Sequence, residues 1–173
     1  MKYLFIIVGD RPQAGKTTTG KHIAKVLAIP HMSTSASINA RVEKRLGLSA
    51  GTVIAARKVE PDNYRKDLII EGDAMAAENY PPGVACLDII GDKGGVIEGI
   101  RREQELADTI AAALRRGLKV TVVAITRAGN EADPDNTEPG VMNRADYMIY
   151  NNSDVASVLC QVDLIIQSVV KNA

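Results

Sequence analysis

Cysteine is scarce in this sequence, and long apolar runs are absent. Its two cysteines, Cys86 and Cys160, form neither a metal-ligand spacing nor a disulfide framework, so we expect a reducing compartment such as the cytoplasm. No run approaches the roughly 20 apolar residues that a membrane-spanning helix needs, so no membrane partner is expected. The short apolar run YLFIIV leads directly into a glycine loop, which argues against a signal peptide.

An excess of one charge is also lacking, because 21 basic residues balance 21 acidic ones. The overall charge therefore predicts no polyanionic partner. The two histidines, His22 and His31, are isolated and have no metal-ligand spacing. With 173 residues, of which 46% are apolar and 24% charged, and with no internal repeat, the sequence predicts one globular domain with a sizeable core.

The segment VGDRPQAGKTTTGKHIA, residues 8–24, has most features of a phosphate-binding loop. The usual pattern is a glycine, any four residues, and then Gly-Lys-Ser/Thr. Gly15-Lys16-Thr17 completes that pattern, but Asp10 stands where the first glycine is expected and the glycine is at Gly9. We expect the extra residue to reshape the entrance of the loop and to leave the part around Gly15 intact.

The sequence on both sides of the loop supports a nucleotide site. Residues 2–8 are almost wholly apolar, as in a strand buried on both faces, and residues 17–27 have a helical pattern. Loop N–H groups and a helix N-terminus bind phosphates, Lys16 adds a positive charge at the β- and γ-phosphates of ATP, and the Thr17 hydroxyl is a ligand for Mg²⁺. The residues expected around ATP here are Gly9, Asp10, Arg11, Gln13, Ala14, Gly15, Lys16, Thr17 and Thr18.

Strands and helices alternate along the remaining sequence. Further strands are predicted at 29–32, 94–100, 118–125 and 145–151. Helices are predicted at 36–46, 49–58, 61–79 and 102–117, with a last helix that begins at Ser153 or Asp154 and ends near Lys171. This order predicts an α/β fold, a parallel five-stranded sheet flanked by helices, with ligands at the C-terminal ends of the strands.

Four stretches, taken in order, resemble P-loop kinases of the deoxynucleoside-monophosphate-kinase type, within the adenylate-kinase-like P-loop NTPases. They are the phosphate loop, VIEGIRREQEL (96–106), VVAITR (122–127) and ADYMIYNNSDVASVL (145–159). The resemblance implies a single kinase domain over residues 1–173 that uses ATP and Mg²⁺. It also implies a helical acceptor lobe at about 36–80 and a short lid at about 127–140.

The resemblance suggests roles for single residues. Glu98, where aspartate is usual, would hold Mg²⁺ through water or orient the acceptor, and Arg101 would stabilise the transferring phosphoryl group. Arg127 would reach the ATP phosphates from the lid, and Asn151 would lie near the adenine edge. An ordinary loop acid, surface arginines and a simple turn are the alternatives. The lid is unusually acidic, because Arg127 stands against Glu131, Asp133, Asp135 and Glu138.

The segment 39–67 of the acceptor lobe carries local positive charge, with seven basic residues against four acidic ones. Within it, LGLSAGTV resembles the turn of a helix-turn-helix with Gly47 at the turn, although Glu43 stands where a small residue is usual. A plain helical lid is the alternative. A basic lobe suits a polymer with several phosphates better than one free nucleotide. The residues expected to bind the acceptor are Ser33, Thr34, Arg41, Arg45, Arg57, Lys58 and Arg65.

A basic acceptor lobe also resembles that of phage kinases that phosphorylate 5-hydroxymethyluracil within DNA. An alcohol acceptor needs a proton acceptor. We choose Asp73, because the neighbouring Gly72 permits close approach of a ligand, with Asp88 and Glu98 as alternatives. The predicted catalytic residues are Lys16, Asp73, Glu98 and Arg101.

Three hypotheses about function follow. The favoured one is a kinase for hydroxymethyluracil in DNA, which would act in the host cytoplasm if a phage encodes it. The second is a kinase for free deoxynucleoside monophosphates. The third is a nucleotide-dependent binding switch without transfer chemistry.

Overall fold

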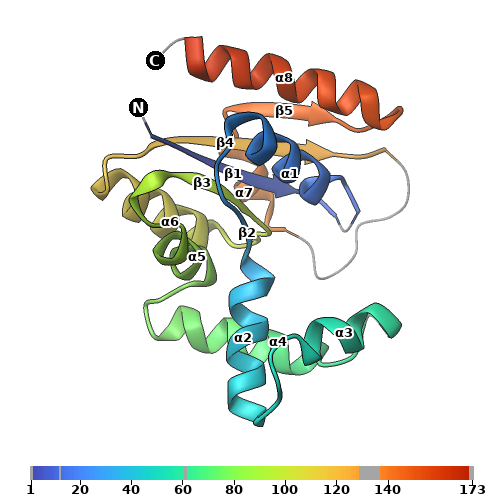
Figure 1. Ribbon diagram of the computed structural model, residues 1–173, viewed down its shortest axis with the longest axis vertical. Helices are drawn as coiled ribbons and strands as arrows, with labels where there is room; N and C mark the ends of the chain where they lie inside the picture. The colour runs from blue at the N-terminus through green and yellow to red at the C-terminus, as the bar shows by residue number, and fades with distance from the viewer. Residues whose placement is uncertain (1, 12, 61, 129–136, 172–173) are drawn as a thin grey trace.

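The computed structural model describes residues 2–11, 13–60, 62–128 and 137–171. Its five strands are β1 (Tyr3–Gly9), β2 (His31–Ser33), β3 (Gly95–Glu98), β4 (Lys119–Thr126) and β5 (Tyr147–Tyr150). They form one parallel sheet in the order β2-β3-β1-β4-β5 (Figure 1). The predicted five-stranded parallel sheet is therefore confirmed.

The central strand β1 is buried on both faces, which explains its continuous apolar sequence. Leu4, Ile6 and Val8 belong to one hydrophobic cluster, whereas Phe5 and Ile7 belong to a second one. Successive side chains of a strand point to opposite faces, so the two clusters are the two sides of the sheet.

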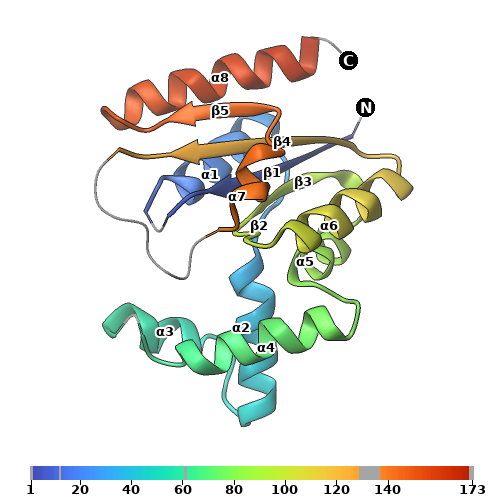
Figure 2. The same cartoon turned by 180° about the vertical axis from the view of Figure 1, so that it is seen from behind.

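Helices cover each of these sides. The first cluster contains side chains from α5 (Pro82–Ile90), α6 (Glu103–Arg115) and α7 (Pro139–Asn143). The second contains side chains from α1 (Lys16–Leu27) and α8 (Val155–Lys171), which lie together in both views (Figures 1 and 2). The Asp154 carboxylate accepts the N–H of Ser157 at 2.8 Å and so caps the start of α8.

Helices α5 and α7 are elements that the sequence analysis missed. The sequence analysis predicted a helix at 61–79 and a strand at 94–100, with no helix between them. Pro82 is the first residue of α5, where a missing N–H costs nothing and the fixed φ of proline suits a helix. The short 3₁₀ helix η1 (Gly91–Lys93) then leads into β3.

Three helices form a lobe that projects from the sheet, seen below it in Figures 1 and 2: α2 (Thr34–Leu46), α3 (Thr52–Val59) and α4 (Arg65–Ala77). Pro61, where this helix was predicted to begin, lies outside the described residues, but residues 62–64 form a turn and α4 begins only at Arg65. Glu43 is 6% exposed, and its Oε1 accepts the N–H of Val53 at 2.9 Å. The residue that departs from the helix-turn-helix pattern therefore fixes the start of α3 against α2.

A buried carboxylate joins α2 to α4. Glu71 of α4 has a side chain only 7% exposed, and it accepts from Nε of Arg41 at 2.8 Å and Nε of Arg45 at 3.1 Å. Arg41 also forms two hydrogen bonds with Glu78, and Arg45 contacts Asp67 at 2.6 Å. Two arginines expected at the acceptor are thus engaged in holding the lobe together.

We expect Glu71→Gln to lower the free energy of unfolding by about 1–3 kcal/mol. Loss of one partner of a buried ion pair costs more than this, but both arginines are partly exposed to water. Urea denaturation measures the change, and the exposed Glu60→Gln is the control, with an expected effect within about 0.5 kcal/mol. Equal midpoints for the two variants would contradict a stabilising role of the network.

Candidate active site

The phosphate loop lies between the end of β1 and the start of α1. Gly15 has φ +112°, and α1 begins at the next residue, so the free N–H groups of its first turn face the loop. A Cβ atom at Gly15 would lie 3.0 Å from Cδ1 of Ile125 and 3.1 Å from Nδ2 of Asn151. Both conformation and space therefore require glycine at this position.

The displaced glycine of the motif also has a structural reason. A Cβ atom at Gly9 would lie 3.0 Å from Cγ of Lys16 and 3.1 Å from the carbonyl oxygen of Ile125. The absence of a side chain at Gly9 therefore leaves room for the stem of Lys16 to pass. The glycine one position earlier than usual therefore makes room for the side chain of Lys16.

Asp10, in the usual place of that glycine, anchors the loop to the neighbouring strand. Its Oδ2 accepts from the hydroxyl of Thr126 at 2.5 Å and from Arg11 at 3.2 Å. Its Oδ1 is buried and has no hydrogen-bond partner within the described part of the chain. The entrance of the loop is thus fixed by a carboxylate that the usual sequence pattern does not contain.

Lys16 lies in an electropositive site. Its Nζ donates to the carbonyl oxygen of Arg11 at 2.7 Å. Burial and the nearby Arg101 lower the pKa of Lys16, while Glu98 and Asp10 act in the opposite direction. Two cations that lie close together near a helix N-terminus are well placed to bind a phosphate group.

Glu98 ends β3 beside the phosphate loop and is only 5% exposed. Its Oε1 accepts from the Thr17 hydroxyl at 3.0 Å, and its Oε2 is buried without a partner among the described residues. Carboxylate and hydroxyl oxygens are the ligands that Mg²⁺ prefers, and this ion usually binds through one or two carboxylates together with substrate phosphates. Thr17 and Glu98 therefore fit a magnesium ion.

The sequence analysis missed a neighbour of Glu98. His31 of β2 has Nε2 at 3.5 Å from Oε1 of Glu98, and its side chain is 17% exposed. It also packs so closely on α1 that a Cβ atom at Gly20 would lie 2.8 Å from Nε2. In the sequence His31 has no ligand spacing, so only the pairing of β2 with β3 reveals its position.

The arginines after β3 take different places. Arg101 is close enough to Lys16 to lower the pKa of that lysine, which puts it at the phosphate site. Arg102 forms an ion pair with Asp73 of α4, a carboxylate that is 52% exposed. The predicted proton acceptor therefore lies near the loop that carries Arg101, but it is already engaged by a cation.

The remaining predicted ATP contacts surround the loop. Asn151, predicted to lie near the adenine edge, donates from Nδ2 to the carbonyl oxygen of Ala14 at 2.8 Å. Its side chain therefore supports the backbone of the phosphate loop. Arg127 is exposed just after β4. Most of the predicted lid, residues 129–136, lies outside the described residues, and Thr137 beyond it donates to the carbonyl oxygen of Gly9 at 2.6 Å.

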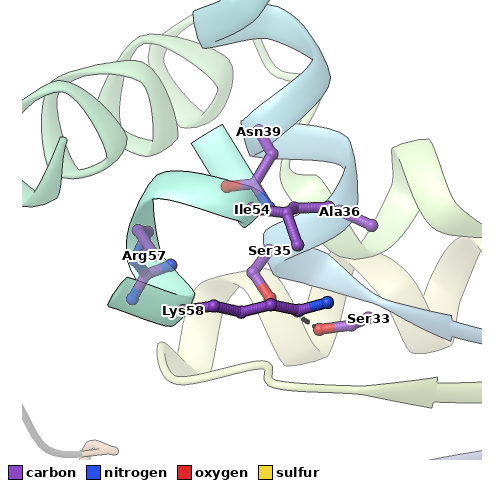
Figure 3. A pocket seen from close by; sticks show the side chains of 7 residues that line it. All are labelled: Ser33, Ser35, Ala36, Asn39, Ile54, Arg57 and Lys58. Atoms are coloured by element: carbon purple, nitrogen blue, oxygen red, sulfur yellow. Dashed lines mark hydrogen bonds between the residues drawn. The ribbon is translucent and has the colours of Figure 1, made fainter. Parts of the chain in front are cut away.

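A cavity of about 350 Å³ lies between β2, α2 and α3 (Figure 3). It is lined by Ser33, Ser35, Ala36, Asn39, Ile54, Arg57 and Lys58. Three of the predicted acceptor residues are among them, whereas Arg41 and Arg45 are held in the ion network and Arg65 pairs with Asp62 at 3.0 Å. Ser33 is the register partner of Glu98, so the cavity adjoins the phosphate site.

Glu105 supports the loop that carries Arg101. Its carboxylate accepts the N–H of Gly83 at 3.1 Å and that of Arg101. Burial raises the pKa of Glu105 to about 7 despite these hydrogen bonds. A carboxyl group that titrates near neutral pH therefore lies directly under the site.

No family model and no curated protein sequence matches the chain, but solved structures resemble it. An APS kinase from Mycobacterium tuberculosis, in complex with AMPPNP and APS, shares 8% identity at a TM-score of 0.56, over 98% of this chain and 99% of that chain. A gluconokinase from Sinorhizobium meliloti 1021 shares 9% identity at a TM-score of 0.56, over 98% and 94%. A shikimate kinase from Aquifex aeolicus shares 15% identity at 0.52, over 96% and 97%.

The chain has the fold of the P-loop kinases. At identities this low the likeness establishes the fold alone, and it agrees with the predicted P-loop NTPase architecture. Among the residues that the structure describes, no helix is both long and apolar enough to cross a membrane.

The raised pKa of Glu105 predicts a pH-dependent stability. Between about pH 4.5, its ordinary value, and about pH 7, the folded protein holds a proton that the unfolded chain releases. The contribution to stability is complete below this window and is lost as pH rises through it, by at most about 3 kcal/mol. Glu105→Gln should remove this loss, so denaturation between pH 5 and pH 8 should show a flatter profile. The exposed Asp92→Asn should keep the wild-type profile; a wild-type slope in Glu105→Gln would contradict the assignment.

Proposed function

We propose that this protein is an ATP-dependent phosphotransferase that moves the γ-phosphoryl group to a hydroxyl of a nucleotide-type acceptor. One observation carries the proposal: Lys16 and Thr17 open α1 behind a left-handed Gly15, and the Thr17 hydroxyl lies 3.0 Å from the buried carboxylate of Glu98. A phosphate-binding loop with a metal-binding acid beside it is the arrangement that phosphoryl transfer requires.

Each group in the site has a role in this reaction. The N–H groups of the loop and of the first turn of α1 bind the phosphates, and Lys16 neutralises charge on the transferring group. Mg²⁺, held by Thr17 directly and by Glu98 through water, would neutralise the β- and γ-phosphates. Arg101 lies on the same side as Lys16 and stabilises charge that spreads over the equatorial oxygens.

The acceptor hydroxyl must lose a proton, and two carboxylates are candidates. Asp73 would first have to leave its ion pair with Arg102. Glu98 is nearer to the transfer point, and its Oε2 is buried without a partner in the described structure. We therefore favour Glu98 as the proton acceptor or orienting group, with Asp73 as the second candidate.

Lys16→Ala should abolish phosphoryl transfer, with a loss of at least about 100-fold, because the contacts that lysine supplies act on the transferring phosphate. The assay is transfer of label from ATP to acceptor, with circular dichroism to show that the fold is kept. Lys25→Ala changes an exposed lysine further along the same helix and should keep full activity. Retention of more than about a tenth of the rate in Lys16→Ala would falsify the phosphate-loop assignment.

We propose 5-hydroxymethyluracil in DNA as the acceptor, on the basis of the resemblance and of the cavity. A cavity of about 350 Å³ accommodates one base rather than a duplex, so a base in DNA would have to leave the stack to enter it. Arg57 and Lys58 line this cavity and would meet the flanking phosphates. Arg41 and Arg45, which are held by acids of α4, add less to this binding than their charge suggests.

The same ion pairs favour a second candidate. With two arginines engaged, the cations at the cavity suit one phosphate as well as several, so a free deoxynucleoside monophosphate is the alternative acceptor. A binding switch would bind ATP at the same loop without any transfer. Labelled ATP offered to both acceptors side by side distinguishes the three.

If DNA is the acceptor, Lys58→Ala should weaken binding across sequences and flatten its salt dependence. The slope of log affinity against log salt should fall by about 0.9 on duplex DNA or about 0.7 on single strands, as expected for one lost phosphate contact. The control is Lys93→Ala, because Lys93 precedes β3 and so lies at the other end of the strand from Glu98. No DNA binding at low salt, together with turnover of a free monophosphate, would support the second candidate instead.

A further inference from the structure

Asn39 is a buried amide in α2 that nothing in the lobe explains. It is 6% exposed, and its Oδ1 is buried without a hydrogen-bond partner in the part of the chain that the structure describes. Leaving such a group unpaired destabilises the fold, and asparagine is a poorer helix former than alanine. An asparagine at this position therefore lowers the stability of the fold, which suggests that its amide binds a ligand.

The amide lines the cavity together with two apolar side chains, Ala36 and Ile54 (Figure 3). Polar groups lie on another side, where Ser33 and Ser35 share a hydrogen bond at 2.7 Å and Lys58 lines the wall. An amide offers a donor beside an acceptor, so it matches a ligand edge with an acceptor beside a donor. The imide edge of a uracil-type pyrimidine has this pattern, and apolar walls suit the faces of its ring.

The position of Asn39 also suits a base whose far side reacts. Thr34 begins α2 just after Ser33, the register partner of Glu98, and Asn39 is five residues further along this helix. At 1.5 Å per residue that is about 7.5 Å, which a pyrimidine ring and its substituent span. A ring whose imide edge is held at Asn39 directs its opposite edge toward Glu98 and the phosphate loop.

We infer that Asn39 binds the imide edge of the acceptor pyrimidine and selects for an unsubstituted N3–H group. The inference rests on the proposed function, because it treats this cavity as the acceptor site. It makes Asn39 a specificity-determining residue that acts on binding and takes no part in the transfer of the phosphoryl group.

The test uses the 5′-monophosphate of 5-hydroxymethyldeoxyuridine and its N3-methyl derivative, which lacks the N3–H donor. Calorimetry without ATP should show that the wild type prefers the unmethylated compound by about tenfold or more, and that Asn39→Ala reduces this preference to about twofold or less. Gln167→Ala removes an exposed amide of α8 and should keep the full preference. An unchanged preference in Asn39→Ala, or a wild type that binds both compounds equally or binds neither, would overturn the inference.

Thermal unfolding supplies a second measurement, because a ligand-binding role and a structural role predict opposite signs. Removal of an unpaired buried amide from a helix should raise the melting temperature by roughly 2–4 °C, whereas loss of a structural contact should lower it. A lower melting temperature would overturn the inference. Since binding is measured without ATP, a protein that transfers no phosphoryl group would contradict the proposed function alone and leave the result for Asn39 standing.

Discussion

The pairing of β3 with its two neighbours is the constraint on which the candidate site depends. Glu98 pairs with Ile7 of β1 on one side and with Ser33 of β2 on the other. The strand β1 leads into the phosphate loop, and β2 leads into α2, which lines the cavity. One buried carboxylate therefore lies between the phosphate loop and the cavity, and the hydrogen bonds of the sheet backbone fix its position relative to both.

The parts of the fold that depend on local pattern could be predicted from the sequence. Four of the five strands lie in largely apolar runs, and the phosphate loop is a contiguous motif between a strand and a helix. Helix α5 was not predicted, because the sequence YPPG (80–83) is typical of the end of one helix and, through Pro82, of the start of another. Where a local pattern fits both the end and the start of a helix, only the tertiary structure shows which of the two is formed.

The parts of the site that depend on distant contacts could not be predicted. Counting charges gave the acceptor lobe a positive surface, but Glu71 lies 26 and 30 positions after Arg45 and Arg41, and no periodicity announces that it pairs with both. Asp10 was expected to contact ATP, and its bond to Thr126 crosses from β1 to β4. Charge in a sequence is a count, whereas charge available to a ligand is what remains after such pairings.

Several buried polar atoms that lack a hydrogen-bond partner in the described part of the chain lie at the candidate site or at its cavity. Oδ1 of Asp10 lies at the phosphate loop, and Oε2 of Glu98 lies at the end of β3. Nε2 of His31, at the start of β2, lies 3.5 Å from the other carboxylate oxygen of Glu98, and Asn39, whose Oδ1 is unpaired, lines the cavity. A buried polar atom without a hydrogen-bond partner makes the folded protein less stable. The apolar core around Leu4, Phe5 and Ile6 of β1 stabilises the fold enough to accommodate these unpaired polar groups at one edge of the sheet. At that edge, bound phosphate, metal and base would supply the missing hydrogen-bond partners.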